Sequence, residues 1–181
     1  MTQAIAFSIA TARDVPALHA LVESAYRGDS ARGGWTHEAD LLGGQRTDQA
    51  ALAEAIASPD QLILLARDAA AIRGCVELTR VGAGRAYLGL LSVAPEWQGR
   101  ALGKALIDAA EAEAQTRFGA THIEMTVIRQ RAALIAYYQR RGYILTGETR
   151  PFPYGDERFG RPRVDDLSFV VLEKPLRSPA A

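Results

Sequence analysis

The sequence predicts one mixed α/β (α+β) domain, with a mostly antiparallel sheet of about seven strands flanked by helices. Its 181 residues suit a single domain with one substantial core. Three strand-like segments near the middle of the chain are separated only by short turns, which is typical of an antiparallel meander. The main helical segment follows this meander instead of alternating with its strands, so a doubly wound parallel sheet is not expected.

The first half of the chain is expected to hold a short strand followed by helices. Apolar and small residues alternate over residues 5–9, which predicts a strand. Residues 14–26 carry apolar side chains at helical spacing, and Pro16 stands in the first turn, where proline is tolerated. Composition then predicts a loop and two short helices: residues 27–34, 35–42 and 48–57.

Glycine and proline residues divide the second half of the chain. The meander strands are expected in three segments: residues 61–67, 71–81 and 85–93. From Gly99 to Phe118 the apolar residues recur at helical spacing, and Gly119 is expected to end that helix. The remaining segments are expected to be a strand, a helix, a strand, a long loop and a last strand: residues 121–128, 131–141, 143–149, 150–163 and 166–173.

Composition argues against several classes of function. The 21 basic and 21 acidic residues balance, which gives no electrostatic reason to expect binding to nucleic acid or to a membrane surface. The single cysteine, Cys75, lies in an apolar run and is expected to be a buried, inert thiol. No spacing of His, Cys or acidic residues suggests a metal site. Residues 1–10 lack the features of a secretory signal and no segment resembles a membrane span, so the expected location is the cytoplasm.

Residues 88–106 form the segment most informative about chemistry. A strand is expected to end at Val93, and small residues then open a long helix. The first turn of a helix has unpaired N–H groups and the positive end of the helix dipole, so phosphate oxygens bind there. The small residues would let the backbone approach a pyrophosphate, and Arg100 and Lys104 add positive charge. Taken alone, the pattern is also typical of an ordinary strand–helix turn, and it matches neither a P-loop nor a Gly-x-Gly-x-x-Gly fingerprint.

The same segment resembles the acetyl-CoA signature of the GNAT superfamily of N-acyltransferases. That signature reads Gln/Arg-x-x-Gly-x-Gly/Ala after a strand ending in hydrophobic-x-Val-x-Pro. Gln98, Ala101 and Gly103 occupy its three marked positions. Val93 and Pro95 stand upstream of them. Alanine replaces the usual first glycine, and its Cβ narrows the loop without blocking amide donation.

A later helical segment resembles the second cofactor helix of the same superfamily. Tyr138, Gly142 and Tyr143 match the pattern of that helix. Arg131 and Leu134 stand where the family usually has Asn and Ala. The order of elements also matches along nearly the whole chain. Gly-Trp-Thr-x-Glu-Ala-Asp at residues 34–40 and Pro-Phe-Pro-Tyr-Gly at residues 151–155 resemble segments of uncharacterised bacterial members of this superfamily.

The resemblance implies that two neighbouring strands splay apart and hold the pantetheine arm of acetyl-CoA between them. The implied reaction is direct attack of a primary amine on the thioester. The cofactor-binding positions implied are Leu91, Ser92, Val93, Gln98, Gly99, Arg100, Ala101, Leu102, Gly103, Lys104, Arg131, Leu134 and Tyr138. The N–H of Leu91 or a neighbour would stabilise the oxyanion, and Tyr138 would protonate the departing thiolate. The adjacent Tyr137 is expected to pack into the core.

The general base and the acceptor site are less well defined. Four carboxylates are candidate bases: Glu38, Asp40, Glu77 and Glu124. A chain of water molecules is the alternative. The family builds its acceptor side from the segment after the first helix and from the late loop, and the substrate-binding residues expected here are Trp35, Glu38, Glu77 and Tyr154. The aromatic residues of these segments, including Phe152 and Phe159, would otherwise serve to pin the loops to the core.

Basic residues gather in sequence near the second cofactor helix. Arg129, Arg131, Arg140 and Arg141, with Arg100 and Lys104 opposite, would either hold the 3′-phosphate of CoA or form a solvated basic face. The expected acceptor is a small amine or a peptide amine, and a homodimer is expected by analogy with the family. The alternative function is a non-catalytic acyl-CoA-binding sensor or regulatory domain.

Overall fold

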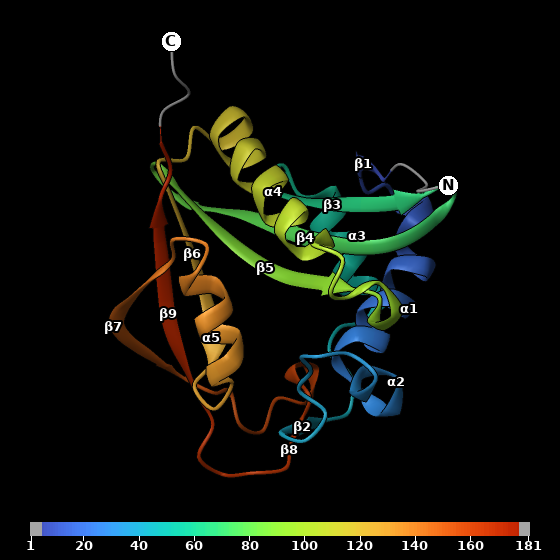
Figure 1. Ribbon diagram of the computed structural model, residues 1–181, viewed down its shortest axis with the longest axis vertical. Coiled ribbons are helices and arrows are strands. Elements are labelled where there is room, and N and C mark those ends of the chain that lie inside the picture. The colour runs from blue at the N-terminus through green and yellow to red at the C-terminus, as the bar shows by residue number, and fades with distance from the viewer. Residues whose placement is uncertain (1–4, 178–181) are drawn as a thin grey trace.

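Seven strands form one continuous sheet in the computed structural model, which describes residues 5–177 (Figure 1). The strands lie in the order β1-β3-β4-β5-β6-β9-β7, and every neighbouring pair is antiparallel except β5 and β6. Their bounds are Ala6–Ile9 (β1), Gln61–Asp68 (β3), Ala71–Gly82 (β4), Arg85–Val93 (β5), His122–Ile128 (β6), Ile144–Pro151 (β7) and Ser168–Pro175 (β9). This arrangement confirms the predicted mixed, mostly antiparallel sheet and its β3–β4–β5 meander.

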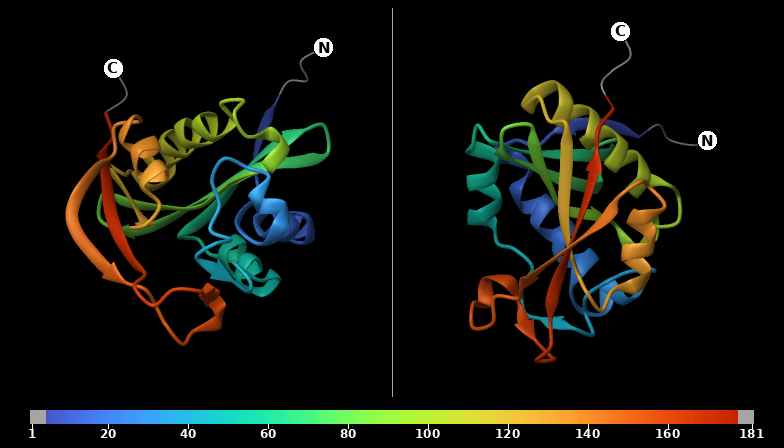
Figure 2. Two further views of the ribbon diagram at one scale, coloured as in Figure 1. Left: turned by 60° about the horizontal axis from the view of Figure 1, so that its bottom comes forward. Right: turned by 90° about the vertical axis from the view of Figure 1, so that its left-hand side faces the viewer.

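Helices cover both faces of the sheet (Figure 2). α1 (Val15–Tyr26) and α3 (Gln49–Ala57) pack on one face. α4 (Leu102–Phe118) and α5 (Ala132–Gln139) pack on the other. α3 begins where predicted because the Asp48 side chain caps it, accepting a hydrogen bond from a first-turn N–H at 2.8 Å. Within residues 5–177, no helix is long and apolar enough to cross a membrane.

The central strands are buried on both sides because their residues alternate between two apolar clusters. Leu62 and Leu64 of β3 belong to the cluster under α4, whereas Ile63 and Leu65 face α1 and α3. Cys75 of β4 lies in the second cluster with no exposed surface, and burial raises the pKa of its thiol to about 12. The prediction of a buried, inert cysteine is therefore confirmed.

The segment between α1 and α3 differs from the sequence prediction. Residues 35–42 do not form the expected helix but turns that lead into β2 (Leu42–Gly43), which pairs with β8 (Arg161–Pro162) of the late loop. Long-range contacts hold this segment in place. For example, the Trp35 N–H donates a hydrogen bond to the Gln98 side chain at 2.8 Å. The preceding residues, expected to form a loop, contain the short helix α2 (Gly28–Arg32).

Helix α4 begins at Leu102 instead of Gly99. Gly99 and Ala101 have φ angles of 75° and 61°, which belong to the left-handed region and cannot continue a right-handed helix. The glycine-rich stretch is therefore a tight turn between the end of β5 and the first turn of α4. The other predicted helix and strands are present, with bounds that differ by a few residues from those expected.

Candidate active site

A gap opens in the sheet between β5 and β6. The two strands are 9 and 7 residues long, yet only Arg85–Tyr87 of β5 pairs with His122–Glu124 of β6. Beyond these pairs the strands diverge (Figure 1). Because β5 and β6 are parallel, the gap lies toward the carboxyl ends of both strands. The splayed pair inferred from the resemblance is thus present.

A β-bulge in β5 accompanies the gap. Between two regular pairs with β4, the strand β5 has two residues, Leu90 and Leu91, where β4 has one. Leu90 has a left-handed φ of 54°, and the Leu91 carbonyl accepts a hydrogen bond from the Tyr26 hydroxyl at 2.7 Å. Among the described residues, the edge of β5 that faces the gap has no strand partner beyond Tyr87. An extended ligand could pair with such an edge.

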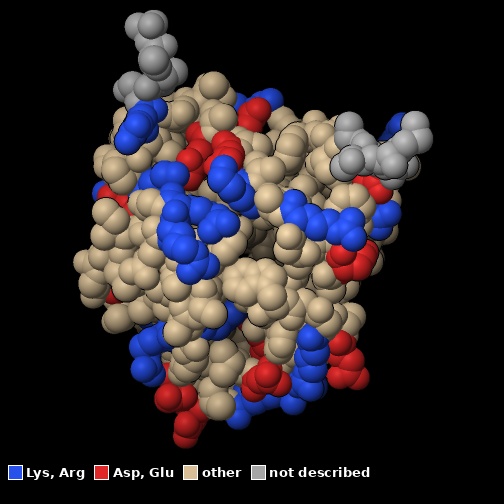
Figure 3. All heavy atoms as spheres, viewed as in Figure 1, with Lys and Arg blue, Asp and Glu red and all other residues tan. Residues whose placement is uncertain are grey.

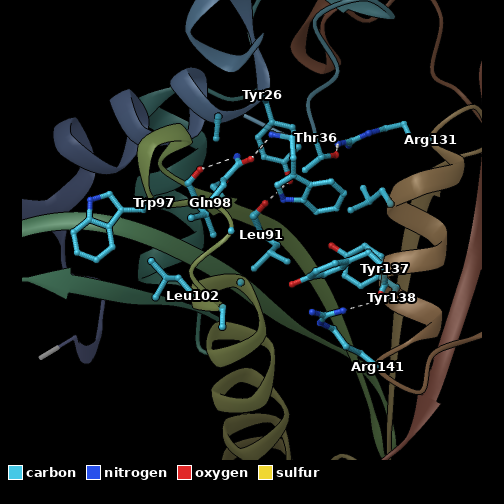
Figure 4. A pocket seen from close by; sticks show the side chains of 18 of the residues that line it. Tyr26, Thr36, Leu91, Trp97, Gln98, Leu102, Arg131, Tyr137, Tyr138 and Arg141 are labelled. Atoms are coloured by element: carbon cyan, nitrogen blue, oxygen red, sulfur yellow. Dashed lines mark hydrogen bonds between the residues drawn. The ribbon is translucent and has the colours of Figure 1, made fainter. Parts of the chain in front are cut away.

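A cavity of about 460 Å³ lies at this gap, between the turn that precedes α4 and one side of α5 (Figure 4). Most of the predicted cofactor-binding residues line it: Leu91, Ser92, Val93, Gln98, Gly99, Ala101, Leu102, Gly103, Arg131, Leu134 and Tyr138. Trp35, which we expected on the acceptor side, lines the same cavity.

The turn before α4 fits a phosphate group. Within the described part of the chain no side chain caps α4, so the N–H groups of its first turn have no capping partner there. A Cβ added at Gly99 would have no atom within 4 Å, which leaves the backbone accessible there. A Cβ at Gly103 would lie 2.9 Å from the Tyr137 hydroxyl, so the two walls approach closely at this point. Free N–H donors at the positive end of a helix bind anions.

Basic side chains surround the cavity, although not all of the predicted ones line it. Arg140 and Arg141 line the cavity. Arg100 instead stacks on a tryptophan ring at 5.1 Å, and Lys104 pairs at 2.5 Å with an aspartate one turn later in α4. Arg129 binds a serine hydroxyl of β9 at 3.3 Å. Lys and Arg side chains still gather on both sides of a hollow on this face of the molecule (Figure 3).

Tyr138 belongs to α5 and projects toward Leu91 (Figure 4). Its side chain is 6% exposed, and its ring packs edge-on against the rings of Tyr137 and Tyr143. Burial raises the pKa of Tyr138, and the neighbouring Tyr26 raises it further, so the phenol is protonated at neutral pH. Among the described residues its hydroxyl has no hydrogen-bond partner, which leaves its proton available to a bound molecule.

The prediction that Tyr137 packs into the core is only partly right, because the half-buried ring packs against the core cluster under α4 but also faces a cavity. Its ring lines the cavity, with the Arg141 guanidinium 3.4 Å above it and the Trp35 ring 5.3 Å away. Figure 4 shows Tyr137 and Tyr138 both projecting from α5 toward Leu91. Successive residues of a helix point about 100° apart, but the cavity extends far enough around α5 to meet both of them.

A second cavity of about 420 Å³ adjoins the first. The residues that line both are Tyr26, Leu91, Arg131, Leu134 and Tyr138. The predicted acceptor residues Glu38 and Glu77 line the second cavity, as do Phe152 and Phe159. The bulge and Tyr138 therefore lie where a molecule in one cavity would meet a molecule in the other.

Glu38 is held in a buried ion pair. Its two carboxylate oxygens accept hydrogen bonds from Arg27 at 2.6 Å and from Arg131 at 3.1 Å. Burial opposes ionisation, but the charges of Arg131, Arg46 and Arg27 outweigh it and lower the pKa of Glu38. A carboxylate with a lowered pKa and two arginine partners is a poor proton acceptor, so the structure disfavours Glu38 as the base.

Glu77 has the environment of a base. Burial raises the pKa of Glu77, while Arg46 opposes the rise, and the Gln61 side chain donates a hydrogen bond to the carboxylate at 3.1 Å. The other two candidates, Glu124 and Asp40, line neither cavity and pair with arginines instead. Glu77 is thus the candidate whose position and pKa both suit proton transfer.

The structure does not bring Tyr154 to the site, so our expectation of substrate binding is not supported. Its hydroxyl accepts a hydrogen bond from the Leu167 N–H at 2.7 Å and donates one to the Val164 carbonyl at 3.1 Å. The side chain is absent from the walls of both cavities. Tyr154 therefore pins the late loop, which is the alternative that the sequence left open.

Sequence reasoning missed Tyr26, Arg27 and Arg46, all of which line the second cavity. Tyr26 and Arg27 stand at the end of α1, where a polar aromatic residue after an apolar helical stripe is a weak signal at best. Arg46 lies in an irregular segment, and no local pattern distinguishes it from a surface arginine.

The sheet is opened by a bulged strand, which lies beside an uncapped, glycine-rich helix start and a buried tyrosine. This combination defines an acyltransferase fold. The chain belongs to the GNAT acetyltransferase family, because the family model "Acetyltransferase (GNAT) domain" matches residues 36–152. A search of curated proteins found no significant match to the sequence.

Solved structures share the fold at low sequence identity. The ribosomal-protein-S18-alanine N-acetyltransferase of Escherichia coli is 18% identical, with a TM-score of 0.69 over 98% of this chain and 97% of that one. Nourseothricin acetyltransferase is 21% identical, with a TM-score of 0.67 over 96% and 99% of the two chains. The yncA protein of Salmonella typhimurium, solved with its cofactor acetyl-CoA, is 20% identical, with a TM-score of 0.67 over 98% and 97%.

Proposed function

We propose that this protein is an N-acetyltransferase that moves the acetyl group of acetyl-CoA to a primary amine. The observation that carries the proposal is the junction of two cavities at the β5 bulge, with Leu91 and Tyr138 in the wall of both. Membership of the GNAT acetyltransferase family supports it. A related structure was solved with acetyl-CoA, which supports the choice of cofactor.

The first cavity is the proposed acetyl-CoA site. The free N–H groups from Gly99 to Gly103 would bind the pyrophosphate, and Arg140 and Arg141 lie where they can meet further phosphate charge. The unpaired edge of β5 from Leu91 to Val93 would hold the pantetheine arm. When bound, acetyl-CoA supplies an activated acetyl thioester.

Three groups of this chain would serve the transfer. Glu77, with its raised pKa, would accept a proton from the ammonium form of the acceptor, directly or through water. A backbone N–H at the bulge, at Leu91 or beside it, would stabilise negative charge on the carbonyl oxygen. Tyr138, which burial keeps protonated, would donate its proton to the thiolate. We also propose a cytoplasmic location and, by analogy with the family, a homodimer.

Calorimetric titration with acetyl-CoA tests the cofactor site. The Gly103→Glu variant puts a carboxylate at the helix start and a side chain against Tyr137, so we expect binding to be lost. Ala112→Glu adds the same side chain at an exposed position of the same helix and should bind like the wild type. A folded wild type that binds no acetyl-CoA would overturn the proposal.

Release of free CoA thiol in the presence of a panel of amines then tests the reaction. We expect release that depends on both acetyl-CoA and the amine. Binding of acetyl-CoA without release by any amine would favour the alternative, a non-catalytic acyl-CoA-binding domain.

A further inference from the structure

The second cavity holds an excess of positive charge. Three arginines line it, Arg27, Arg46 and Arg131. Glu38 is ion-paired with Arg27 and Arg131 and therefore compensates only part of their charge. The other carboxylate in the wall, Glu77, has a pKa raised by burial, which favours its neutral form relative to an exposed glutamate.

Arg27 is buried with part of its guanidinium unsatisfied. Its side chain is 6% exposed, and Nη1 donates to Glu38 at 2.6 Å. Its Nε and Nη2 atoms have no hydrogen-bond partner among the described residues. Buried polar groups in proteins are nearly always paired, and a charged donor left unpaired is especially costly. These two atoms have almost no accessible surface, so Arg27 adds a buried, partly uncompensated positive charge beside the cavity and not an exposed donor.

Arg46 presents a guanidinium to the same cavity. Its contact with the chain is stacking over the Tyr26 ring at 5.0 Å, and within residues 5–177 its side chain has no ion pair or hydrogen bond. The backbone at this position is fixed, because the Arg46 N–H donates to the Glu23 carboxylate at 2.8 Å. A positioned arginine with free N–H groups is suited to bidentate binding of a carboxylate.

Much of the rest of the wall is apolar, and the cavity limits the size of the ligand. Leu88, Met125, Val127, Phe152 and Phe169 line it, and the volume of about 420 Å³ fits a small molecule. A cationic or polycationic amine would bring further positive charge next to Arg27 and Arg46, which costs energy. A small amine with an anionic group would instead offset this charge.

We infer that the acceptor is a small amine that also carries a carboxylate, of the amino-acid class, and that Arg46 binds this carboxylate beside the buried positive charge of Arg27. The inference rests on the proposed function, because it places an acceptor in the second cavity. It adds the class of acceptor and a residue that determines specificity.

Matched pairs of acceptors test the inference. Leucine, methionine, phenylalanine and glutamate would each be compared with the corresponding α-amide, which keeps the amine and the side chain but lacks the α-carboxylate. CoA release should favour the acid in the best pair by about 10- to 100-fold in kcat/KM, as expected for loss of a charged hydrogen-bonded contact. Arg46→Gln should remove this preference mainly by raising KM for the acid, and Arg46→Lys should restore part of it.

Arg117→Gln is the matched control, because Arg117 is half exposed at the far end of α4, lines neither cavity, and pairs with Glu113. It should keep the preference of the wild type. Thermal unfolding and acetyl-CoA titration of each variant would show that fold and cofactor binding are intact. Equal rates with acids and amides, or a preference that survives Arg46→Gln, would overturn the inference while leaving acetyl transfer intact.

The same acids and amides should be titrated into the protein without acetyl-CoA. Binding of the acids that Arg46→Gln weakens would support the carboxylate site even if acetyl-CoA failed to bind and the proposed function were wrong. If no member of any pair binds or reacts, the inference is wrong.

Discussion

Two buried tyrosines on α5 and just after it differ in what their hydroxyls contact. The Tyr143 hydroxyl donates to Glu111 at 3.1 Å, whereas the Tyr138 hydroxyl has no partner among the described residues and lies in the wall of both cavities. Removing the Tyr138 hydroxyl should therefore cost little stability and much activity. We expect Tyr138→Phe to lower kcat by about 10²- to 10⁴-fold, the usual contribution of a general acid, with its unfolding free energy nearly unchanged.

Tyr143→Phe provides the control for this prediction. It removes a hydroxyl from a ring that packs on Tyr138, and the loss of its hydrogen bond should cost about 1 kcal/mol of stability. Its kcat should stay near that of the wild type. Steady-state kinetics and denaturant unfolding of both variants make the comparison. Similar values of kcat for Tyr138→Phe and the wild type would exclude Tyr138 as the acid.

At the scale of elements, the turn before α4 has a strained backbone at Ala101. Ala101 adopts a left-handed φ of 61°, a conformation that glycine adopts at little cost and that alanine disfavours. We expect Ala101→Gly to raise the unfolding free energy by about 0.5–1 kcal/mol. Because the N–H groups of the turn stay in place, acetyl-CoA affinity should be equal to or higher than that of the wild type in calorimetry.

Ala69 offers a matched control outside the site. It has a φ of 52° in the turn between β3 and β4, so Ala69→Gly should give a similar gain in stability without a change in acetyl-CoA affinity. If Ala101→Gly destabilises the protein while Ala69→Gly stabilises it, the Ala101 methyl group makes contacts that outweigh its backbone strain.

The elements that sequence analysis predicted well are those specified by local signals. The β3–β4–β5 meander has short turns, and α3 has its own cap at Asp48. Residues 35–42 have no such signal, and their conformation depends on contacts with Gln98, Arg27 and Arg131 from other parts of the chain. Long-range side-chain pairs of this kind override helix propensity.

The candidate site was predictable to different degrees on its two sides. The turn before α4 is continuous in sequence, so spacing and resemblance together predicted the residues from Gln98 to Gly103, of which all but Arg100 line the first cavity. The second cavity combines residues of α1, β4, β5, β6, α5 and irregular segments, and its charged members come together only after folding. For that reason the sequence did not reveal the ion pairs that make Glu38 a poor candidate base, nor the place of Arg46 in the cavity wall.

For the molecule as a whole, two glutamates of the second cavity, the buried Glu38 and the half-buried Glu77, should affect the pH dependence of stability with opposite signs. Burial raises the pKa of Glu77 above its ordinary value of 4.5, so the folded state binds this proton more tightly than the unfolded state. Its contribution to stability is present below pH 4.5 and is lost as pH rises through the raised pKa. Glu77→Gln should therefore stabilise the protein at pH 7, and the gain should disappear at acidic pH.

Glu38 provides the opposite case. Burial hinders its ionisation, but Arg131, Arg46 and Arg27 lower its pKa below the ordinary value of 4.5. Its contribution to the stability of the fold is therefore present above pH 4.5 and is lost as pH falls through the lowered pKa. Glu38→Gln should cost about 3–5 kcal/mol at neutral pH, because it leaves two buried arginines without their counter-charge. Urea unfolding of both variants at neutral and acidic pH measures the sign of each change in unfolding free energy. A stabilising effect of Glu38→Gln at pH 7 would contradict a stabilising ion pair of Glu38 with Arg27 and Arg131.

The sheet consists of two halves that are joined by only three residue pairs between β5 and β6. The proposed acetyl-CoA site has one wall in each half, with the β5 end and α4 on one side and α5 on the other. A ligand that contacts both walls should couple the two halves and suppress local opening of each.

We expect hydrogen exchange to slow in both walls when acetyl-CoA binds: residues 88–93, 99–106 and 131–141. Protection in α3 and β1 should change much less, because neither element contributes a residue to the wall of the first cavity. Slower exchange in the α4 wall but not in α5 would show that the ligand binds the phosphate turn without bridging the gap, and the role assigned to Tyr138 would then fail.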